Sequence, residues 1–355
     1  MITKKGWASK FMISAYKKET AYDAGVTMSA ANAYSMKGFS AEVDWDDKVV
    51  TDKDDITGTE EGTDQELVEQ GLKIAYKETN AKPNSVIAMA GLVGGSITST
   101  QDGALIAYKH KVVRVALGTA IPSIQAEALI GDLQYAFKGV KGSRFKLSGE
   151  ASGMVSLEAD LIGSGTRAIS TTSFVAAVTE SWLKMRDCKV WMESGNAISI
   201  SPALVQAAED ISSGTPRALG VRLKSFSFEF DNAGEKQVGS GGGGVGQDYD
   251  YGRRKSALAI NLLYNDSTEL GDFINQNPLA VEFDLKGAGP IAQGGTLYYG
   301  VQLIIPRTKL KKAPWPKGAA NDILTCDLDI EVFEDGTNPP FILEGYNAKA
   351  AYLVA

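Results

Sequence analysis

The stretch FSAEVD at residues 39–44 recurs near the middle of the chain as FSFEFD at residues 226–231. In both copies apolar and polar side chains alternate, which is the pattern of a half-buried β-strand. The residues that follow the two copies also match each other in order. The chain is therefore predicted to contain one β-rich unit written twice.

Each copy is followed by the same series of segments: a polar loop rich in Gly and Asp, an alternating strand, a short helix, an Ile-Pro that ends a strand, and an acidic alternating strand. These segments lie at residues 45–66, 71–76, 83–90, 121–122 and 155–161 in the first copy, and at residues 232–255, 257–262, 266–275, 305–306 and 324–332 in the second. The first helix has a proline near its start and Gly94-Gly95 beyond its end, and Asp266 and Glu269 in the second have capping-box spacing.

The repeat predicts two tandem domains, at residues 39–175 and 176–334, with a boundary between 164 and 187. Residues 1–38 are expected to form an N-terminal arm and residues 335–355 a C-terminal extension. Strands so outnumber helices that each domain is predicted to be a β-sandwich or partly closed barrel with one short helix. Two similar surfaces on one subunit are useful for closing a ring.

Composition indicates a folded, water-soluble protein and argues against several functions. Of the 355 residues, 44% are hydrophobic and 22% charged, and no run of 18 apolar residues exists, so we expect no spanning helix. We expect no signal peptide, and two cysteines are too few for a disulfide-stapled scaffold. A single histidine does not support a metal cluster or a Ser-His-Asp triad. The net charge of −7 has the wrong sign for gripping nucleic acid.

Three motif-like strings carry no chemistry on inspection. The glycine run at 239–246 contains G-x-G-x-x-G, but no helix signal and no Lys-Ser/Thr follow it. Asp52 begins a calcium-loop pattern that Ile56 and Thr57 break, and the sequon at Asn265 has no meaning without secretion. The sequence therefore predicts no catalytic, cofactor-binding or metal-binding residue, and no enzymatic activity.

Carboxylates gather on the polar sides of the alternating strands. They are Glu42, Asp44, Glu158, Asp160, Glu229, Asp231, Glu282, Asp284, Asp327, Asp329 and Glu331. An ordinary solvated sheet face is one interpretation. Another is a shared channel whose carboxylates keep a polyanion from sticking to the wall. Acid/base chemistry, as in glycoside cleavage, is disfavoured because the acids are spread over several strands among lysines and small residues.

The chain resembles the major tail tube proteins of long-tailed bacteriophages (siphophages), in the subset whose subunit carries two fused tube domains. The resemblance rests on KETAY at 18–22, KSFSFEFDNA at 224–233 with its Gly-rich loop, GRRKSAL at 252–258, LIIPR at 303–307 and the strand that opens at 322–324. It covers most of the chain. The unusually Gly-rich second loop and the extension 335–355 depart from the family pattern.

The resemblance implies that three subunits form a pseudo-hexameric ring, in which neighbouring domains donate strands to one inner β-barrel. Rings would stack into the conduit for DNA ejection, with the acidic faces toward the lumen. The N-terminal arm and the two long loops would reach the adjacent ring, with Asp46, Asp54, Asp55, Glu61, Gly241, Gly244, Asp248 and Tyr251 as candidate contacts. Implied partners are further copies of the chain, the tape measure protein and DNA in the lumen, and the tail terminator and baseplate proteins at the ends. The expected location is the virion tail, after assembly in the host cytoplasm, with no membrane partner and no cofactor.

Two alternatives stay open. A baseplate or tail-terminator protein of the same fold would form one ring and stop. A carbohydrate-binding or adhesive β-sandwich would need a platform of exposed aromatic residues, whereas the tryptophans are scattered along the sequence, at Trp7, Trp45, Trp182, Trp191 and Trp315.

Overall fold

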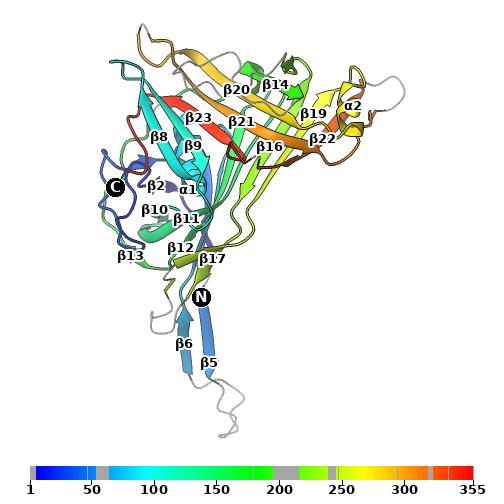
Figure 1. The fold of residues 1–355 in the computed structure, drawn as a ribbon. Helices are drawn as coiled ribbons and strands as arrows, with labels where there is room; N and C mark the ends of the chain where they lie inside the picture. Colours follow the sequence, from blue (N-terminus) through cyan, green and yellow to red (C-terminus); the bar gives the residue numbers. More distant parts are fainter. Residues whose placement is uncertain are drawn as a thin grey trace.

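The structure is a computed structural model of the chain (Figure 1). It describes residues 5–45, 47–52, 64–178, 180–194, 216–238, 245–246, 248–293, 295–318, 323–334 and 336–354.

Most strands belong to two sheets. The first has the order β4, β7, β12, β11, β16, β19, β22, with every neighbouring pair antiparallel. These strands are Phe39–Asp44, Leu72–Glu78, Val155–Gly163, Leu133–Glu150, Leu223–Asp231, Lys255–Leu263 and Thr325–Val332. The second has the order β8, β9, β23, β21, β20, β14, and its strands cross those of the first sheet in Figure 1. They are Gly95–Gln101, Tyr108–Arg114, Ile342–Asn347, Tyr298–Leu310, Leu279–Pro290 and Cys188–Ser194. The fold is mainly β, as predicted.

Shorter strands complete the two halves. β10 pairs with the first half of β11 and with β2, and β2 pairs with β3. β13 also pairs with β11, and β1 pairs with β4. β15 pairs with β14, and the 3-10 turn η1 contacts β20. Their bounds are Ile124–Ile130 (β10), Lys10–Ile13 (β2), Tyr34–Ser35 (β3), Arg167–Ile169 (β13), Lys5–Trp7 (β1), Arg217–Ala218 (β15) and Met185–Asp187 (η1).

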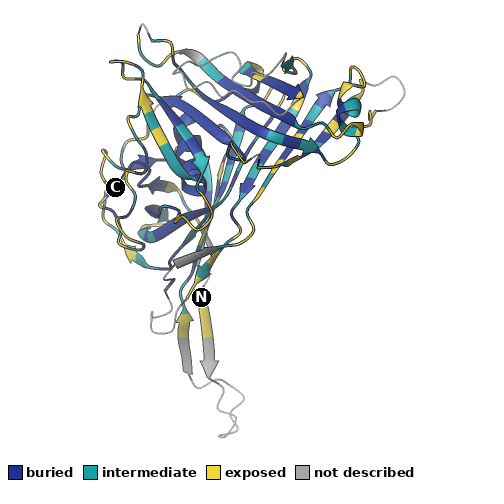
Figure 2. Cartoon of the chain, viewed as in Figure 1, coloured by how far each residue is buried: buried dark blue, intermediate teal, exposed yellow. Residues whose placement is uncertain are grey.

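The core lies on the apolar side of the first sheet. Burial alternates along β12, where Leu157, Ala159 and Leu161 are inside, and along β16, where Phe228 and Phe230 are inside. These residues belong to one hydrophobic cluster with members from both predicted domains (Figure 2). Burying this alternate set of side chains supplies the main stabilising free energy of the fold.

Both predicted helices are present. α1 (Pro83–Gly94) is buried along its whole length, and it ends at Gly95, whose φ of 90° is accessible mainly to glycine. α2 (Thr268–Ile274) starts at Ser267, and the Asp266 carboxylate accepts a hydrogen bond from the Thr268 amide. The predicted capping box is wrong because Glu269 binds the Arg222 guanidinium instead.

The two long polar loops have hairpin stems. β5 (Lys48–Asp52) pairs with β6 (Asp64–Glu69), and β17 (Gly234–Gln237) pairs with β18 (Asp248–Tyr251). The β5–β6 hairpin projects away from the sheets in Figure 1, and Lys236 of β17 forms a 2.8 Å ion pair with Glu69 at its base. The two hairpins therefore leave the molecule at the same end.

The two Ile-Pro pairs are not equivalent, contrary to the prediction. Ile121-Pro122 lies in the irregular segment before β10, whereas Pro306 lies inside β21. It occupies a bulge, because the pairing with β20 jumps from Ile305 to Thr308. A bulge tolerates a residue without an amide donor, so proline does not end the strand here.

Both terminal segments are integrated into the fold. Residues Phe11 to Ile13 of β2 are buried, so most of the expected N-terminal arm packs against its own subunit. β23, from the expected C-terminal extension, lies between β21 of the second half and β9 of the first, and all six of its residues are buried. Near the C-terminal end, Val354 forms an isolated parallel β-bridge with the backbone of Lys17.

Candidate functional site

The first sheet presents one polar face, formed by the side chains that alternate with its core residues. We call it the polar sheet face. It carries all the predicted acids except Glu282 and Asp284. The cross-strand pairs set these acids in rows: one row runs Ala75, Asp160, Arg144, Asp231, Lys255 across β7, β12, β11, β16 and β19.

The centre of this face is held by charge pairs across the strands. Arg144 Nε donates to Asp160 Oδ2 at 2.6 Å and Nη1 to Glu229 Oε2 at 3.4 Å, so one guanidinium links β12, β11 and β16. The hydrogen bond to Asp160 raises the pKa of Arg144. Lys77 binds Glu158 at 2.9 Å, and this hydrogen bond lowers the pKa of the carboxyl. Ionised partners stabilise each other at such distances.

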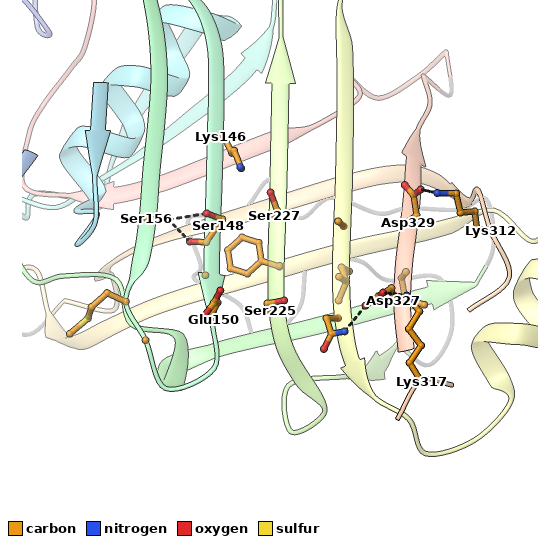
Figure 3. Close-up of a pocket in the computed structure, with 18 of the residues that line it drawn as sticks. Lys146, Ser148, Glu150, Ser156, Ser225, Ser227, Lys312, Lys317, Asp327 and Asp329 are labelled. Carbon is orange, nitrogen blue, oxygen red and sulfur yellow. Dashed lines mark hydrogen bonds and ion pairs between the residues drawn. The ribbon is translucent and has the colours of Figure 1, made fainter. Parts of the chain in front are cut away.

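Strand β22, at the far side of the face from β4, has a similar arrangement (Figure 3). Asp327 accepts from Lys317 at 2.5 Å and from Asn261 at 2.5 Å, and these bonds lower the pKa of Asp327. Asp329 lies 3.2 Å from the Lys312 ammonium group. Both lysines come from the segment after β21, which folds back beside β22.

Bases are thus interleaved with the acids on the polar sheet face. Sequence reasoning noted lysines among the acids, but it did not name Lys73, Lys77, Arg144 and Lys146 as members of this face. The signal was available, because Arg144 and Lys146 alternate with the buried residues Phe145 and Leu147 in the same way as the acids alternate with theirs.

A hollow of about 940 Å³ lies on this face. Figure 3 shows Ser148, Ser156, Ser225 and Ser227 to one side of the Asp327–Lys317 and Asp329–Lys312 pairs, and Ser148 and Ser156 share a 2.8 Å hydrogen bond. Hydroxyls and paired charges make this surface hydrophilic without a strong net charge. Among the described residues, no group of three or more His, Cys, Asp or Glu side chains is placed to hold a metal ion.

Glu282 and Asp284 lie elsewhere. They are on β20 in the second sheet, with 0% and 2% exposure. Gln302 donates to Glu282, and burial raises the pKa of Asp284 to about 6. Residues already buried inside the subunit do not fit a channel wall, so we leave both out of the polar sheet face.

The candidate contacts in the long loops fall mostly outside the described residues. Asp46, Asp54, Asp55, Glu61, Gly241 and Gly244 lie there, and of Asp248 only the backbone in β18 is described. Tyr251 ends β18 and its ring lies 5.7 Å from the Arg254 guanidinium. Apolar side chains are exposed on the stem of the first hairpin instead: Val49 at 48% and Leu67 at 43%.

The family model of the phage tail tube protein matches residues 80–332. The chain belongs to the phage tail tube protein family. The match begins just before α1 and ends with β22, so it includes most strands of both sheets. No curated protein matches the chain.

Membership of the tail tube family makes the chain a structural component of a phage tail that assembles with itself into a tube. Within the described residues, neither helix has the length and apolarity that crossing a membrane requires.

Proposed function

We propose that this tail tube protein is of the siphophage, two-domain type, and that three copies close a pseudo-hexameric ring. Its first sheet supports this. β4, β7, β12 and β11 follow one another in the first half, and β16, β19, β22 and the end of β21 follow in the same order in the second.

One observation carries the proposal: the two four-stranded blocks are joined edge to edge by seven residue pairs between β11 and β16. Two blocks in one chain thus already form a continuous stretch of sheet. Repeating the same joint between chains closes a barrel and removes exposed sheet edges. Six blocks then need three chains, with residues 39–175 and 176–334 as the two tube domains.

The polar sheet face is the proposed lumen wall, because the opposite face of this sheet is the hydrophobic core. Acids in ion pairs and serine hydroxyls repel or weakly bind a passing phosphate backbone, while the interleaved bases keep the subunit from repelling itself. DNA, and the tape measure protein before it, would pass over this face during ejection.

Stacking of rings is proposed to use the β5–β6 hairpin, which projects from one end of the molecule (Figure 1). Val49 and Leu67 are opposite each other across its strands and both are exposed. Burying such side chains against the next ring would be favourable by about 25 cal/mol per Å² of apolar area.

Electron microscopy of the concentrated, purified protein tests this function. Hollow tubes whose averaged rings have threefold symmetry, with six similar lobes, are expected. Monomers without rings would contradict the proposal. Single rings that never stack would instead favour the terminator or baseplate role of the same fold, and in virions the copy number separates the two, since a tube protein is abundant.

Assembly would occur in the host cytoplasm, with terminator and baseplate proteins binding the two ends of the tube. The adhesive β-sandwich gains no support from the tryptophans. Trp191 is buried, and the exposed Trp7, Trp182 and Trp315 belong to separate parts of the chain: β1, the segment before η1 and the segment after β21.

A further inference from the structure

The edge of the first sheet at β4 is covered by the chain's own N-terminal segment. β1 pairs antiparallel with β4, with Lys5, Gly6 and Trp7 opposite Asp44, Val43 and Glu42. Without β1, β4 would present an open row of amide and carbonyl groups.

β1 occupies the position that β11 has in the internal joint. β4 and β16 are the two copies of the repeated stretch, so Asp44 corresponds to Asp231. Asp231 is opposite Arg144 of β11, and Asp44 is opposite Lys5 of β1. A basic residue therefore holds the same register position in both pairs.

The hydrogen-bond phase of the two pairs is also the same. The Ala8 amide donates to the Ala41 carbonyl in one, and the Asn232 amide donates to the Ser143 carbonyl in the other. In an antiparallel ladder, bonded and non-bonded pairs alternate. Asp44 lies three residues from Ala41, and Asp231 lies one residue from Asn232. Both distances are odd, so both aspartates fall on non-bonded pairs.

β1 is nevertheless a weak substitute for β11. Among the described residues it contributes three residue pairs where the internal joint has seven, and its Trp7 side chain remains 64% exposed. A longer strand of the right register would displace it with a gain in cross-strand pairs.

The strand that corresponds to β11 in the second half is β21. β11 pairs with the strand before it, β10, and then with β12. In the same way, β21 pairs with the strand before it, β20, and then with β22. Lys309 lies opposite Glu331 of β22 as Arg144 lies opposite Asp160 of β12. The Lys311 amide continues this ladder with a bond to the Asp329 carbonyl.

β11 pairs with β16 along one of its edges. The corresponding edge at the end of β21 is available for pairing with another strand. Its pairing with β20 stops at Thr308, and among the described residues no strand takes over along that edge. Pro314 limits a new pairing to residues 309–313.

We propose that β1 is a placeholder strand, which protects the β4 edge of the free subunit and is displaced during assembly by the end of β21 from a second copy. Lys309 and Lys311 of one copy then lie opposite Asp44 and Glu42 of the next, repeating the acid and base alternation of Arg144 and Lys146 with Asp231 and Glu229. The inference rests on the proposed ring and specifies its joint. Displacement ensures that the edge opens only to a strand of this chain.

A disulfide that locks β1 onto β4 tests the displacement. Trp7 and Glu42 are opposite residues, and their pair is of the non-bonded type, whose Cα atoms lie about 4.5 Å apart and suit a disulfide. Oxidised W7C/E42C is expected to form rings and tubes about tenfold more slowly than the same protein in dithiothreitol, an effect of about 1.4 kcal/mol on the barrier. The reduced protein and the two single variants are matched controls, since native Cys188 and Cys326 are buried.

Locked protein, verified by mass spectrometry, that assembles as fast as reduced protein would overturn the placeholder role. Wild-type protein that forms neither rings nor tubes would overturn the proposed function instead. Should W7C/E42C not fold by circular dichroism, deletion of residues 1–7 replaces it, with faster assembly expected and an unchanged rate contradicting the inference.

A second disulfide tests the contact with β21. In assembled D44C/K309C, oxidation is expected to join chains into covalent species up to the trimer on a non-reducing gel, while D44C and K309C alone give none. Tubes that form normally without such crosslinks would show that another strand takes the β4 edge.

Discussion

Asp284 is a buried carboxyl whose ionisation opposes folding. Its Oδ1 atom has no hydrogen-bond partner among the described residues, and burial raises its pKa from 3.8 to about 6, against the lowering influence of Lys189 and Lys286. Because the folded pKa is the higher one, this group favours the folded state below pH 3.8 and loses that contribution as pH rises through about 6. Asp284→Asn should raise the free energy of unfolding by about 2 kcal/mol at pH 8 and change it little at pH 3.5. Urea unfolding at the two pH values measures this.

Glu158→Gln is the opposite control. The hydrogen bond from Lys77 lowers the pKa of Glu158 below 4.5, so its contribution is present above that pH and lost as pH falls through the folded value. Because the pair is partly exposed, E158Q should cost only about 0.5 kcal/mol at pH 7 and nothing at pH 3. Equal effects of either substitution at both pH values would contradict the charge account.

At the level of residues, alternation predicted which side chains of each strand face the core. It did not distinguish Glu158, on the polar sheet face, from Glu282 and Asp284, because both sets alternate with apolar residues. The difference depends on what covers the second face of each sheet, which no local pattern encodes. The partners of the acids were missed because cross-strand register brings together Lys77 and Glu158, residues far apart in the sequence.

Helix α1 packs closely against β11 at Gly142. A Cβ atom on Gly142 would lie 2.9 Å from backbone atoms of Leu92 and Val93. Backbone does not move aside as a flexible side chain does, so Gly142→Ala should lower the free energy of unfolding by about 3 kcal/mol.

Gly271→Ala on α2 is the matched control, because no atom lies within 4 Å of its added Cβ. Removing a helical glycine there should stabilise the protein by up to about 1 kcal/mol. Urea denaturation of both variants measures the free energy of unfolding. If G142A left this free energy unchanged, α1 would be less tightly packed against β11 than described.

The β5–β6 hairpin gives a prediction about assembly. V49S/L67S removes two exposed apolar side chains, so the free energy of unfolding of the subunit should change by less than about 0.5 kcal/mol. Tubes should become shorter at a given concentration, as measured in micrographs. Val221→Ser alters an equally apolar residue that is 92% exposed on another part of the surface, and should leave tube length unchanged. Normal tubes from V49S/L67S would exclude this hairpin from stacking.

At the level of elements, α1 was predictable because its proline, apolar run and glycine stop are local signals. The hairpin stems were not, since the loops that contain them are largely polar and the pairing of the stems is set by the strands that they extend. The bulge at Pro306 and the insertion of β23 between β9 and β21 also lay beyond sequence reasoning, because each depends on a partner from a distant part of the chain.

For the whole molecule, the repeated stretch predicted two similar blocks, and the joint between β11 and β16 adds how such blocks connect. In the proposed ring, each block has one edge that fits an edge of the next block. Such a contact is heterologous, so copies would add head to tail until the ring closes. In that ring, one side of the sheet would face the core of the subunit and the other the proposed lumen.

Charge reversal on β22 tests the proposed lumen wall. In phage carrying D327K/D329K/E331K, three acids of β22 become bases, and each ring gains a band of positive charge on the proposed lumen wall. Tubes should still assemble, since Asp327 and Glu331 are exposed, but DNA release from triggered virions should be about tenfold slower. Raised salt should restore the rate, because phosphate contacts weaken steeply with ionic strength.

The variant K312D/K317D, which makes the same region more acidic, should release DNA at the normal rate. If the triple variant does not assemble, E331K alone should show a smaller delay of the same salt dependence. Release at the wild-type rate from assembled variant tails would mean that β22 does not face the DNA.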